Sequence, residues 1–299
     1  MIFYFSATGN TRWAAQRVAE ATQERLVSIA EALSGDCRFE LSPTERIGFA
    51  FPVHGWRPPL PVRRFVEHLS VRLTTEHELD DEDLKGEWLM RSLLAREETR
   101  ARFCYALITA GDDIGETTEW LDRALAANPL LHRLGIYRLH SAFSLVMPNT
   151  YVGLPGMTID APAKVAEKKK RAAELLEEYL PLIVERQKGE RRLHLSRWPR
   201  TNSRLLGGLF ERFLLTDGPF RVDRERCIQC GICAEVCPTE NVIGGRKRYP
   251  QWKHDGSCIT CFACYHHCPQ RAIDYGSRTR GKGQYAYQGH KPYKPNRPY

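Results

Sequence analysis

The chain has 299 residues, which exceeds one domain of ordinary size and makes two domains the first expectation. Its composition is globular, 42% hydrophobic and 10% aromatic, and no apolar run is long enough to span a bilayer, so we expect a cytoplasmic protein without a membrane partner. The formal charge of +8 favours anionic ligands but does not by itself indicate a nucleic-acid partner. Eight of the ten cysteines fall within 227–268, a pattern unlike a secreted disulfide framework.

The N-terminal segment predicts a buried parallel strand over 2–5, followed by a hydroxyl- and glycine-rich turn and a helix over about 12–26. Such a turn places backbone N–H groups and the helix N-terminus around one point, which is typical of an anion site. It lacks the lysine of a Walker loop and the spacing of a dinucleotide loop, so a phosphate monoester suits it best. A strand-to-helix turn without a ligand is the alternative. The residues of this candidate phosphate loop are Ser6, Ala7, Thr8, Gly9, Asn10 and Thr11.

This stretch resembles the flavodoxin family, because Ile2-Phe3-Tyr4, Ser6, Gly9, Thr11 and Ala15 stand at that family's spacing. The resemblance implies a flavodoxin-like, doubly wound parallel α/β sheet. It also implies FMN, with the phosphate held by the candidate phosphate loop. The other FMN loops are then expected after later strands, at the carboxyl edge of the sheet.

Two later turns are candidates for those loops. One follows a predicted strand over 46–51, and its Trp56 or His54 is a candidate to stack on the flavin, although an ordinary half-buried tryptophan is the alternative. The other follows a strand over 103–108. Its carboxylates would disfavour an anionic reduced flavin, or one of them would cap the next helix. The two turns consist of Pro52, Val53, His54, Gly55 and Trp56, and of Thr109, Ala110, Gly111, Asp112 and Asp113.

The remaining N-terminal elements are assigned from their hydrophobic patterns. Helices are expected over 60–69, 88–100, 116–127 and 161–187, a solvated acidic loop over 74–87 and a last strand over 137–146. The turn 147–151 after that strand is a weaker candidate for the FMN edge. The basic run 168–171 reads as a solvated helix face. A basic linker over 188–219 contains a short helix in which Phe210, Phe213 and Leu214 are expected to pack.

Near the C-terminus the pattern C-x2-C-x2-C-x3-C-P occurs twice, the spacing with which bacterial ferredoxins hold [4Fe–4S] clusters. Structural zinc sites also use C-x2-C pairs, but would leave the third cysteine and the proline without a role. Because the fourth cysteine of each motif ligates the other cluster in such proteins, the two expected sets are crossed. One set is Cys227, Cys230, Cys233 and Cys268, and the other is Cys258, Cys261, Cys264 and Cys237.

This region resembles the two-cluster bacterial ferredoxins over 220–276, a small α+β domain in which 220–223 and 272–275 are expected to pair as strands. Apolar side chains within the motifs are expected to form a small core around the clusters: Ile228, Ile232, Val236, Ile259 and Phe262. The basic, tyrosine-containing tail over 277–299 is expected either to be disordered or to lie over the other domain. A sensor that uses the clusters structurally and the tail for nucleic acid is a further alternative.

The predicted organisation is therefore an FMN-binding domain over 1–187, a linker over 188–219, a two-cluster domain over 220–276 and a tail over 277–299. This combination resembles a family of flavodoxin–ferredoxin fusion proteins of anaerobes. Since each cluster passes one electron and FMN holds one or two, we predict a protein that passes electrons between the clusters, FMN and redox partner proteins. An FMN-dependent reductase with a small-molecule substrate is the alternative. No residue is singled out as a general acid or base, so the sequence leaves the choice between enzyme and electron carrier open.

Overall fold

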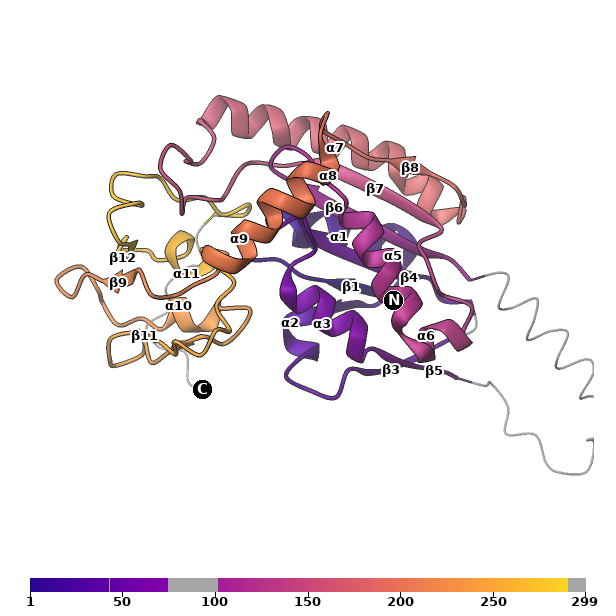
Figure 1. Cartoon of the computed structure of the whole chain (residues 1–299), viewed down its shortest axis with the longest axis horizontal. Helices are drawn as coiled ribbons and strands as arrows, with labels where there is room; N and C mark the ends of the chain where they lie inside the picture. Colours follow the sequence, from indigo (N-terminus) through magenta and orange to yellow (C-terminus); the bar gives the residue numbers. More distant parts are fainter. Residues whose placement is uncertain (43, 75–101, 290–299) are drawn as a thin grey trace, which may run out of the picture.

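The computed structural model describes residues 1–42, 44–74 and 102–289, and it shows an α/β part packed against a smaller C-terminal part (Figure 1). The predicted helix over 88–100 and nearly all of the acidic segment 74–87 lie outside the described residues. No helix within the described ranges has the length and apolar character needed to cross a membrane.

The centre of the α/β part is a six-stranded sheet in which all neighbouring strands run parallel. Strands β4 and β6 are buried almost throughout, as expected for apolar runs covered on both faces. The sheet order is β2-β1-β4-β6-β7-β8. Its strands are β1 (Ile2–Tyr4), β2 (Leu26–Ser28), β4 (Ile47–Pro52), β6 (Cys104–Ala110), β7 (Ser141–Val146) and β8 (Arg191–Arg192).

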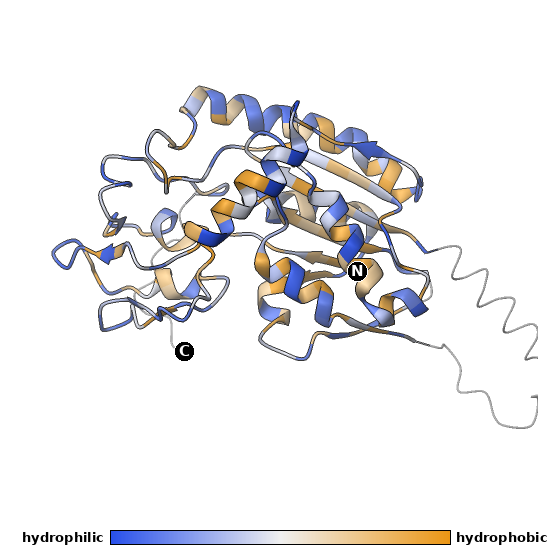
Figure 2. Ribbon diagram, viewed as in Figure 1, coloured by the Kyte–Doolittle hydropathy of each residue, from blue (hydrophilic) through white to orange (hydrophobic). Residues whose placement is uncertain are grey.

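Helices cover both faces of this sheet (Figure 1). On one face, α1 (Asn10–Thr22) and α7 (Pro162–Val184) share a core with β1, β6 and β7. On the other, α3 (Leu60–His68) and α5 (Thr117–Ala127) share a core with β4. This arrangement agrees with the predicted doubly wound α/β architecture. Figure 2 shows the strands as largely hydrophobic and the outer faces of the helices as mostly hydrophilic.

The chain order reverses beside β1, because β2 lies on one side of it and all later strands of the sheet lie on the other. In open α/β sheets, ligands bind outside the carboxyl ends of the strands at such a reversal. Fold topology therefore points to the loops that follow β1 and β4. The smaller elements of this part are α2 (Ile29–Ala32), α6 (Pro129–Arg133) and a separate parallel pair, β3 (Arg38–Leu41) with β5 (Ser70–Leu73).

Two predicted boundaries were wrong. The first helix ends at Thr22, because Gln23 adopts a left-handed conformation with φ of 56°, and the next residues form β2 against Ile2. The last strand begins at Ser141 and not at Tyr137, whose side chain is 48% exposed. Both errors have the same cause, since pairing with a neighbouring strand decided the boundary and not local hydrophobicity.

The linker contains a continuous helical segment made of α8 (Pro199–Thr201), the π-helical turn η1 (Asn202–Leu206) and α9 (Gly207–Phe213). Arg57 is buried and fastens this segment to the α/β part. It donates hydrogen bonds to the carbonyls of Ser203 (2.6 Å) and Arg204 (3.1 Å) and pairs with the carboxylate of Glu211 (2.6 Å). Of the aromatic residues expected to pack here, Phe210 is buried, but Phe213 is 64% exposed and that expectation was wrong.

In the C-terminal part, β9 (Phe220–Val222) pairs antiparallel with β12 (Ile273–Tyr275), which confirms the predicted pairing. Two short helices, α10 (Ile232–Glu235) and α11 (Ala263–His266), and a small hairpin, β10 (Val242–Ile243) with β11 (Gln251–Trp252), complete this part. Three of the expected core residues, Ile232, Ile259 and Phe262, are buried. Ile228 is 44% exposed, so its assignment to the core was wrong.

Replacement of Arg57 by leucine is expected to lower the free energy of unfolding by about 2–4 kcal/mol, because two carbonyls would lose their donor and Glu211 would keep only Arg63 as its partner in a largely buried position. The measurement is urea unfolding followed by tryptophan fluorescence. Arg212→Leu in the same helical segment is the matched control, since Arg212 is exposed and its loss is expected to cost less than about 0.5 kcal/mol. Equal effects of the two substitutions would contradict the role assigned to Arg57.

Candidate functional site

The three turns singled out in the sequence converge at the carboxyl edge of the sheet. They line one cavity of about 110 Å³ at the strand-order reversal. From these turns, the cavity lining contains Ser6, Ala7, Thr8, Asn10, Thr11, Pro52, Val53, His54, Thr109, Ala110 and Gly111. Residues 147–151, the weaker candidate, line it as well.

The candidate phosphate loop joins β1 to the N-terminus of α1. Gly9 has a φ of 96° and donates its N–H to Ser6 Oγ (3.2 Å). The hydroxyls of Thr11 and Thr109 share a hydrogen bond of 2.7 Å, which ties this loop to the turn after β6. Neutral donors and the N-terminus of a 13-residue helix therefore meet at one point, an arrangement that suits an anion.

A second cavity, of about 340 Å³, adjoins the first and shares His54, Gly111 and Tyr151 with it. The remaining predicted turn residues, Gly55, Trp56, Asp112 and Asp113, line this larger space. Trp56 is fixed there because its Nε1 donates to Asp113 Oδ2 at 2.9 Å.

One side chain in these turns, His54, has a shifted pKa, and the two aspartates accept hydrogen bonds from the backbone. Burial lowers the pKa of His54 to about 4, so its imidazole is neutral near pH 7. Asp113 does not cap a helix, because α5 is preceded by Glu116 without a side-chain cap. The carboxylate of Asp113 instead accepts from Gly115 N–H (2.9 Å), and that of Asp112 accepts from Asp113 N–H (2.7 Å). The helix-cap alternative for these two aspartates was therefore wrong.

Lys168 is a residue of the site that sequence reasoning missed. It was assigned to a solvated helix face, but its Nζ donates to the carbonyl of Gly111 (2.8 Å) and pairs with Asp160 (2.8 Å) beside the larger cavity. Lys169 also contacts the protein, as its Nζ lies 4.0 Å from the Tyr287 ring. The only signal in the sequence was the position of the run on the N-terminal half of a long helix that packs on the sheet.

The cysteines of the first motif gather around a small cavity of about 20 Å³. Cys227, Cys230 and Cys233 line it together with Cys268 of the second motif. Burial raises the pKa of Cys233 to about 12, and repulsion from the thiolates of Cys230, Cys268 and Cys227 adds to this effect. These four sulfurs are therefore close neighbours, although Cys268 lies 35 residues or more from the other three in the sequence.

The second set likewise contains three cysteines of the second motif and the last cysteine of the first motif, Cys237. Burial raises the pKa of Cys258 to about 12, and the Cys237 thiolate contributes. The pKa values of Cys261 and Cys264 are likewise raised, first by burial and then by neighbouring thiolates that include Cys237. Buried thiols that repel one another bind metal favourably, because coordination stabilises the thiolate form.

Among the described residues, no three Cys, His, Asp or Glu side chains are grouped tightly enough to hold a single metal ion. A cubane differs from such a site, because its four thiolates bind four separate irons.

The second cysteine motif lies directly against the candidate phosphate loop. Cys261 lines the cavity of about 110 Å³. His267 Nε2 lies 3.3 Å from the carbonyl of Ala7 in that loop. The neighbouring His266 is fully buried, and its Nε2 lies 2.7 Å from the carbonyl of Thr150, another residue that lines the cavity. His266 Nδ1 accepts from Tyr285 N–H (3.2 Å), so Nε2 carries the proton and donates to Thr150.

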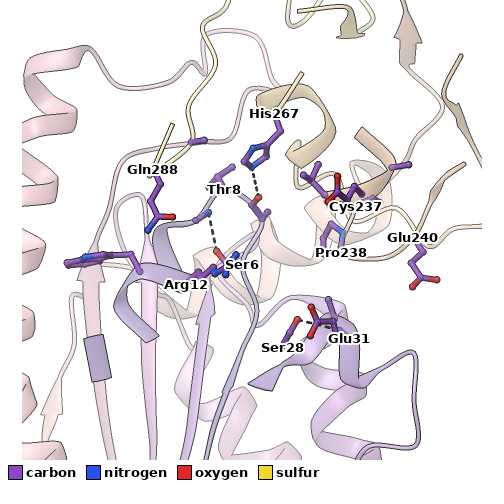
Figure 3. Close-up of a pocket in the computed structure, with 18 of the residues that line it drawn as sticks. Ser6, Thr8, Arg12, Ser28, Glu31, Cys237, Pro238, Glu240, His267 and Gln288 are labelled. Atoms are coloured by element: carbon purple, nitrogen blue, oxygen red, sulfur yellow. Dashed lines mark hydrogen bonds between the residues drawn. The ribbon is translucent and has the colours of Figure 1, made fainter. Parts of the chain in front are cut away.

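Figure 3 shows a larger cavity, of about 860 Å³, on the β2 side of the phosphate loop. Ser6, Thr8 and Arg12 border it on the side of the α/β part, and Cys237 and Glu240 on the side of the cysteine motifs. It did not emerge from the sequence, because its walls come from five segments that only the fold brings together.

The tail crosses from the cysteine motifs to the phosphate loop. Gln284 Nε2 donates to the carbonyls of Tyr265 (2.6 Å) and Cys268 (2.9 Å). Tyr285 Oη donates to Asn10 Oδ1 (2.7 Å), and Tyr287 N–H donates to the Thr8 carbonyl (2.9 Å). The Tyr287 ring stacks on Trp13 with centroids 5.1 Å apart. The described part of the tail therefore lies over the α/β part, one of the two predicted outcomes.

Comparison with known proteins agrees with the cysteine pattern. The family model of a 4Fe-4S dicluster domain matches residues 220–269. A search of curated proteins found no match for the chain. The C-terminal region is therefore an iron–sulfur region of the kind used in electron transfer.

Replacement of Tyr287 by alanine is expected to loosen the phosphate loop, because it removes the stacking on Trp13 and the Lys169 contact. Amide hydrogen exchange over 8–13 should accelerate on the order of tenfold. Tyr137→Ala, which removes an exposed tyrosine elsewhere in the α/β part, is the control. Unchanged exchange in the Tyr287 variant would show that the tail does not restrain the loop.

Proposed function

We propose that this protein is an electron-transfer flavo-iron–sulfur protein that passes single electrons between two [4Fe–4S] clusters and FMN, and exchanges them with redox partner proteins. The match to a 4Fe-4S dicluster domain supports the iron–sulfur half. The observation that carries the connection to a flavin is the position of Cys261, which lines the same cavity as the candidate phosphate loop. An electron on the cluster of the second motif would therefore lie beside the proposed flavin site.

The α/β part fits FMN in three respects. Apart from the short edge strand β8, its order β2-β1-β4-β6-β7 is the 2-1-3-4-5 order of flavodoxin, where FMN lies at the strand-order reversal. The loop at that position offers the neutral donors and helix N-terminus that suit a phosphate monoester. The adjoining cavity of about 340 Å³ extends between Trp56, Tyr151 and Phe210, whose rings suit a planar aromatic group.

In this arrangement the candidate phosphate loop holds the phosphate, and the turns after β4 and β6 flank the isoalloxazine. FMN supplies the ability to hold one or two electrons, which the clusters lack. Asp112 and Asp113 place negative charge beside the cavity of about 340 Å³ and disfavour an anionic reduced flavin. The positive charge of Lys168, which lines the same cavity, acts in the opposite direction. His54 is uncharged at neutral pH, because its burial lowers the pKa of the imidazole to about 4.

The two crossed sets of cysteines fit two [4Fe–4S] clusters. Cys227, Cys230, Cys233 and Cys268 line one cavity, and the electrostatic coupling of Cys258, Cys261 and Cys264 with Cys237 supports the second set. The protein's own contribution is to cover these cysteines, three of which are buried and five partly buried, which limits the access of water and tunes the potentials of the clusters.

An FMN-dependent reductase is the second candidate. It is favoured by the size of the cavity of about 340 Å³ and by the aromatic residues that line it. We place the electron carrier first, because the cysteine motifs and α9 pack against the loops that would hold the flavin. A small-molecule substrate that oxidises the bound flavin in stoichiometric turnover would reverse this order.

Anaerobic purification followed by reductive titration tests the proposal. We expect roughly one FMN per chain and two clusters visible by electron paramagnetic resonance, with the clusters and the flavin reduced in sequence. Clusters without any affinity for FMN would contradict the flavin half. Zinc in place of iron would contradict the whole proposal.

The crossed ligand sets predict how paired substitutions act on iron content. Cys237→Ala with Cys264→Ala removes two ligands of one cluster, so about half of the iron should remain. Cys237→Ala with Cys233→Ala damages both clusters and should remove nearly all of it. Cys37→Ala, outside the motifs, is the control and should retain all the iron. The reverse pattern for the two double variants would show that each motif binds its own cluster without exchange.

A further inference from the structure

We propose that the exposed basic surface beside the first cysteine motif docks an acidic one-electron carrier protein. The surface is defined by Arg224, Lys247, Arg248 and Arg271, with Ile228 at its centre. The proposal rests on the proposed function and adds to it the surface, the charge of the partner and the order of electron flow.

The loop over 244–248 lies in contact with the first motif. Gly245 has a φ of 84°, and a Cβ at this position would lie 3.2 Å from Cys233 Sγ and 3.1 Å from Gly231 Cα. Lys247 N–H donates to the Gln229 carbonyl at 3.3 Å. Because the backbone of the loop is this close to a cluster ligand, the exposed side chains of the next residues stand next to the cluster site.

The charges of this surface are mainly positive. Arg224 lies 5.2 Å from the Tyr249 ring, which joins it to the 244–248 loop, and Arg226 donates a hydrogen bond to the Arg271 carbonyl. The two neighbouring aspartates, Asp223 and Asp274, are both paired with Arg226, at 2.7 and 3.1 Å. Glu225 is the remaining acid of this segment. The four cations that define the surface are all exposed, and none of them is ion-paired with another residue that the structure describes: Arg224, Lys247, Arg248 and Arg271.

An apolar residue stands among these cations. Ile228, the second residue of the first motif, is 44% exposed, and Cys227 and Cys230 on either side of it are only partly covered. An apolar centre with a charged rim is the usual composition of a transient docking surface. Here that centre lies between two proposed cluster ligands, so a docked carrier would approach the first cluster across very little protein.

The two proposed cluster sites have different surroundings. The second motif contacts the α/β part through Cys261, His266 and His267. The hydrogen bonds of Arg226 and Lys247 stay within the C-terminal part. The order that follows is carrier, first cluster, second cluster and flavin, or the same order reversed.

An acidic carrier fits better than an uncharged one because the exposed cations attract it and offset the negative charge of the cluster with its four thiolates. The same cations raise the association rate of an acidic protein by roughly 10–10³-fold at low salt. Nucleic acid would also be attracted to a basic surface, but it would give the exposed Ile228 between two cluster ligands no role.

The test is the rate at which a photoreduced acidic [2Fe–2S] ferredoxin of the plant type reduces the holoprotein anaerobically at low salt. Lys247→Glu with Arg248→Glu should slow this reduction at least tenfold and weaken its dependence on salt. The control, Arg133→Glu with Lys170→Glu, makes the same change of charge on exposed residues of α6 and α7 and should change the rate less than about twofold. Reduction by photoreduced deazaflavin, a small molecule that needs no docking, should be equal in all variants.

Each other result contradicts the docking proposal. One such result is that the acidic ferredoxin reduces the wild-type protein no faster than the Lys247/Arg248 variant, and another is that both charge reversals slow the reduction equally. Loss of single-stranded DNA binding in the Lys247/Arg248 variant with an unchanged reduction rate would assign the surface to nucleic acid instead. Failure of the proposed function can be distinguished from failure of the docking proposal. In the first case, photoreduced deazaflavin would leave the clusters or the flavin unreduced even in the wild-type protein.

Discussion

The contact between the second cysteine motif and the phosphate loop is the constraint on which the rest of this structure depends. His267 reaches the Ala7 carbonyl, His266 donates to the Thr150 carbonyl, and Cys261 enters the wall of the cavity at the end of β1. Electron transfer between buried centres requires that they be held close together. A loose tether between two domains would not do this, so the proposed function makes the interface itself a functional element.

Two further segments fasten that interface from either side. The helical segment of the linker is held to the α/β part by the buried Arg57, and the Thr260 hydroxyl donates to the Leu214 carbonyl at its end (2.8 Å). The tail returns across the interface through Tyr285 and Tyr287. The chain therefore crosses from one part to the other twice, and both crossings bear on the loops that line the candidate flavin cavity.

The features that could be predicted from the sequence are those encoded within short stretches. The spacing of the eight cysteines indicated clusters, and the strand-turn-helix pattern at Ser6–Thr11 indicated an anion site. The convergence of the turns after β1, β4 and β6 followed from the rule that carboxyl ends of parallel strands share one edge. Each of these inferences needs only local pattern and the regular geometry of a parallel sheet.

What the sequence could not reveal depends on contacts between distant residues. Lys168 looked like one cation in a solvated run, and only packing of α7 places it beside Gly111. Tyr285 and Tyr287 lie in a stretch without periodicity, so nothing local tied them to Asn10 and Trp13. Ile228 looked like a core residue, because hydrophobicity alone does not distinguish burial from a docking surface.

Spin relaxation of the flavin radical tests the central claim most directly. With the protein poised anaerobically so that flavin semiquinone and a reduced cluster coexist, microwave power saturation of the radical reports a nearby paramagnetic centre. If the flavin lies beside Cys261, its radical relaxes fast in the intact protein. The relaxation becomes slow when Cys237→Ala with Cys264→Ala removes the cluster of the second motif. A radical that relaxes as slowly in the intact protein as in this variant would contradict the placement of the flavin beside Cys261.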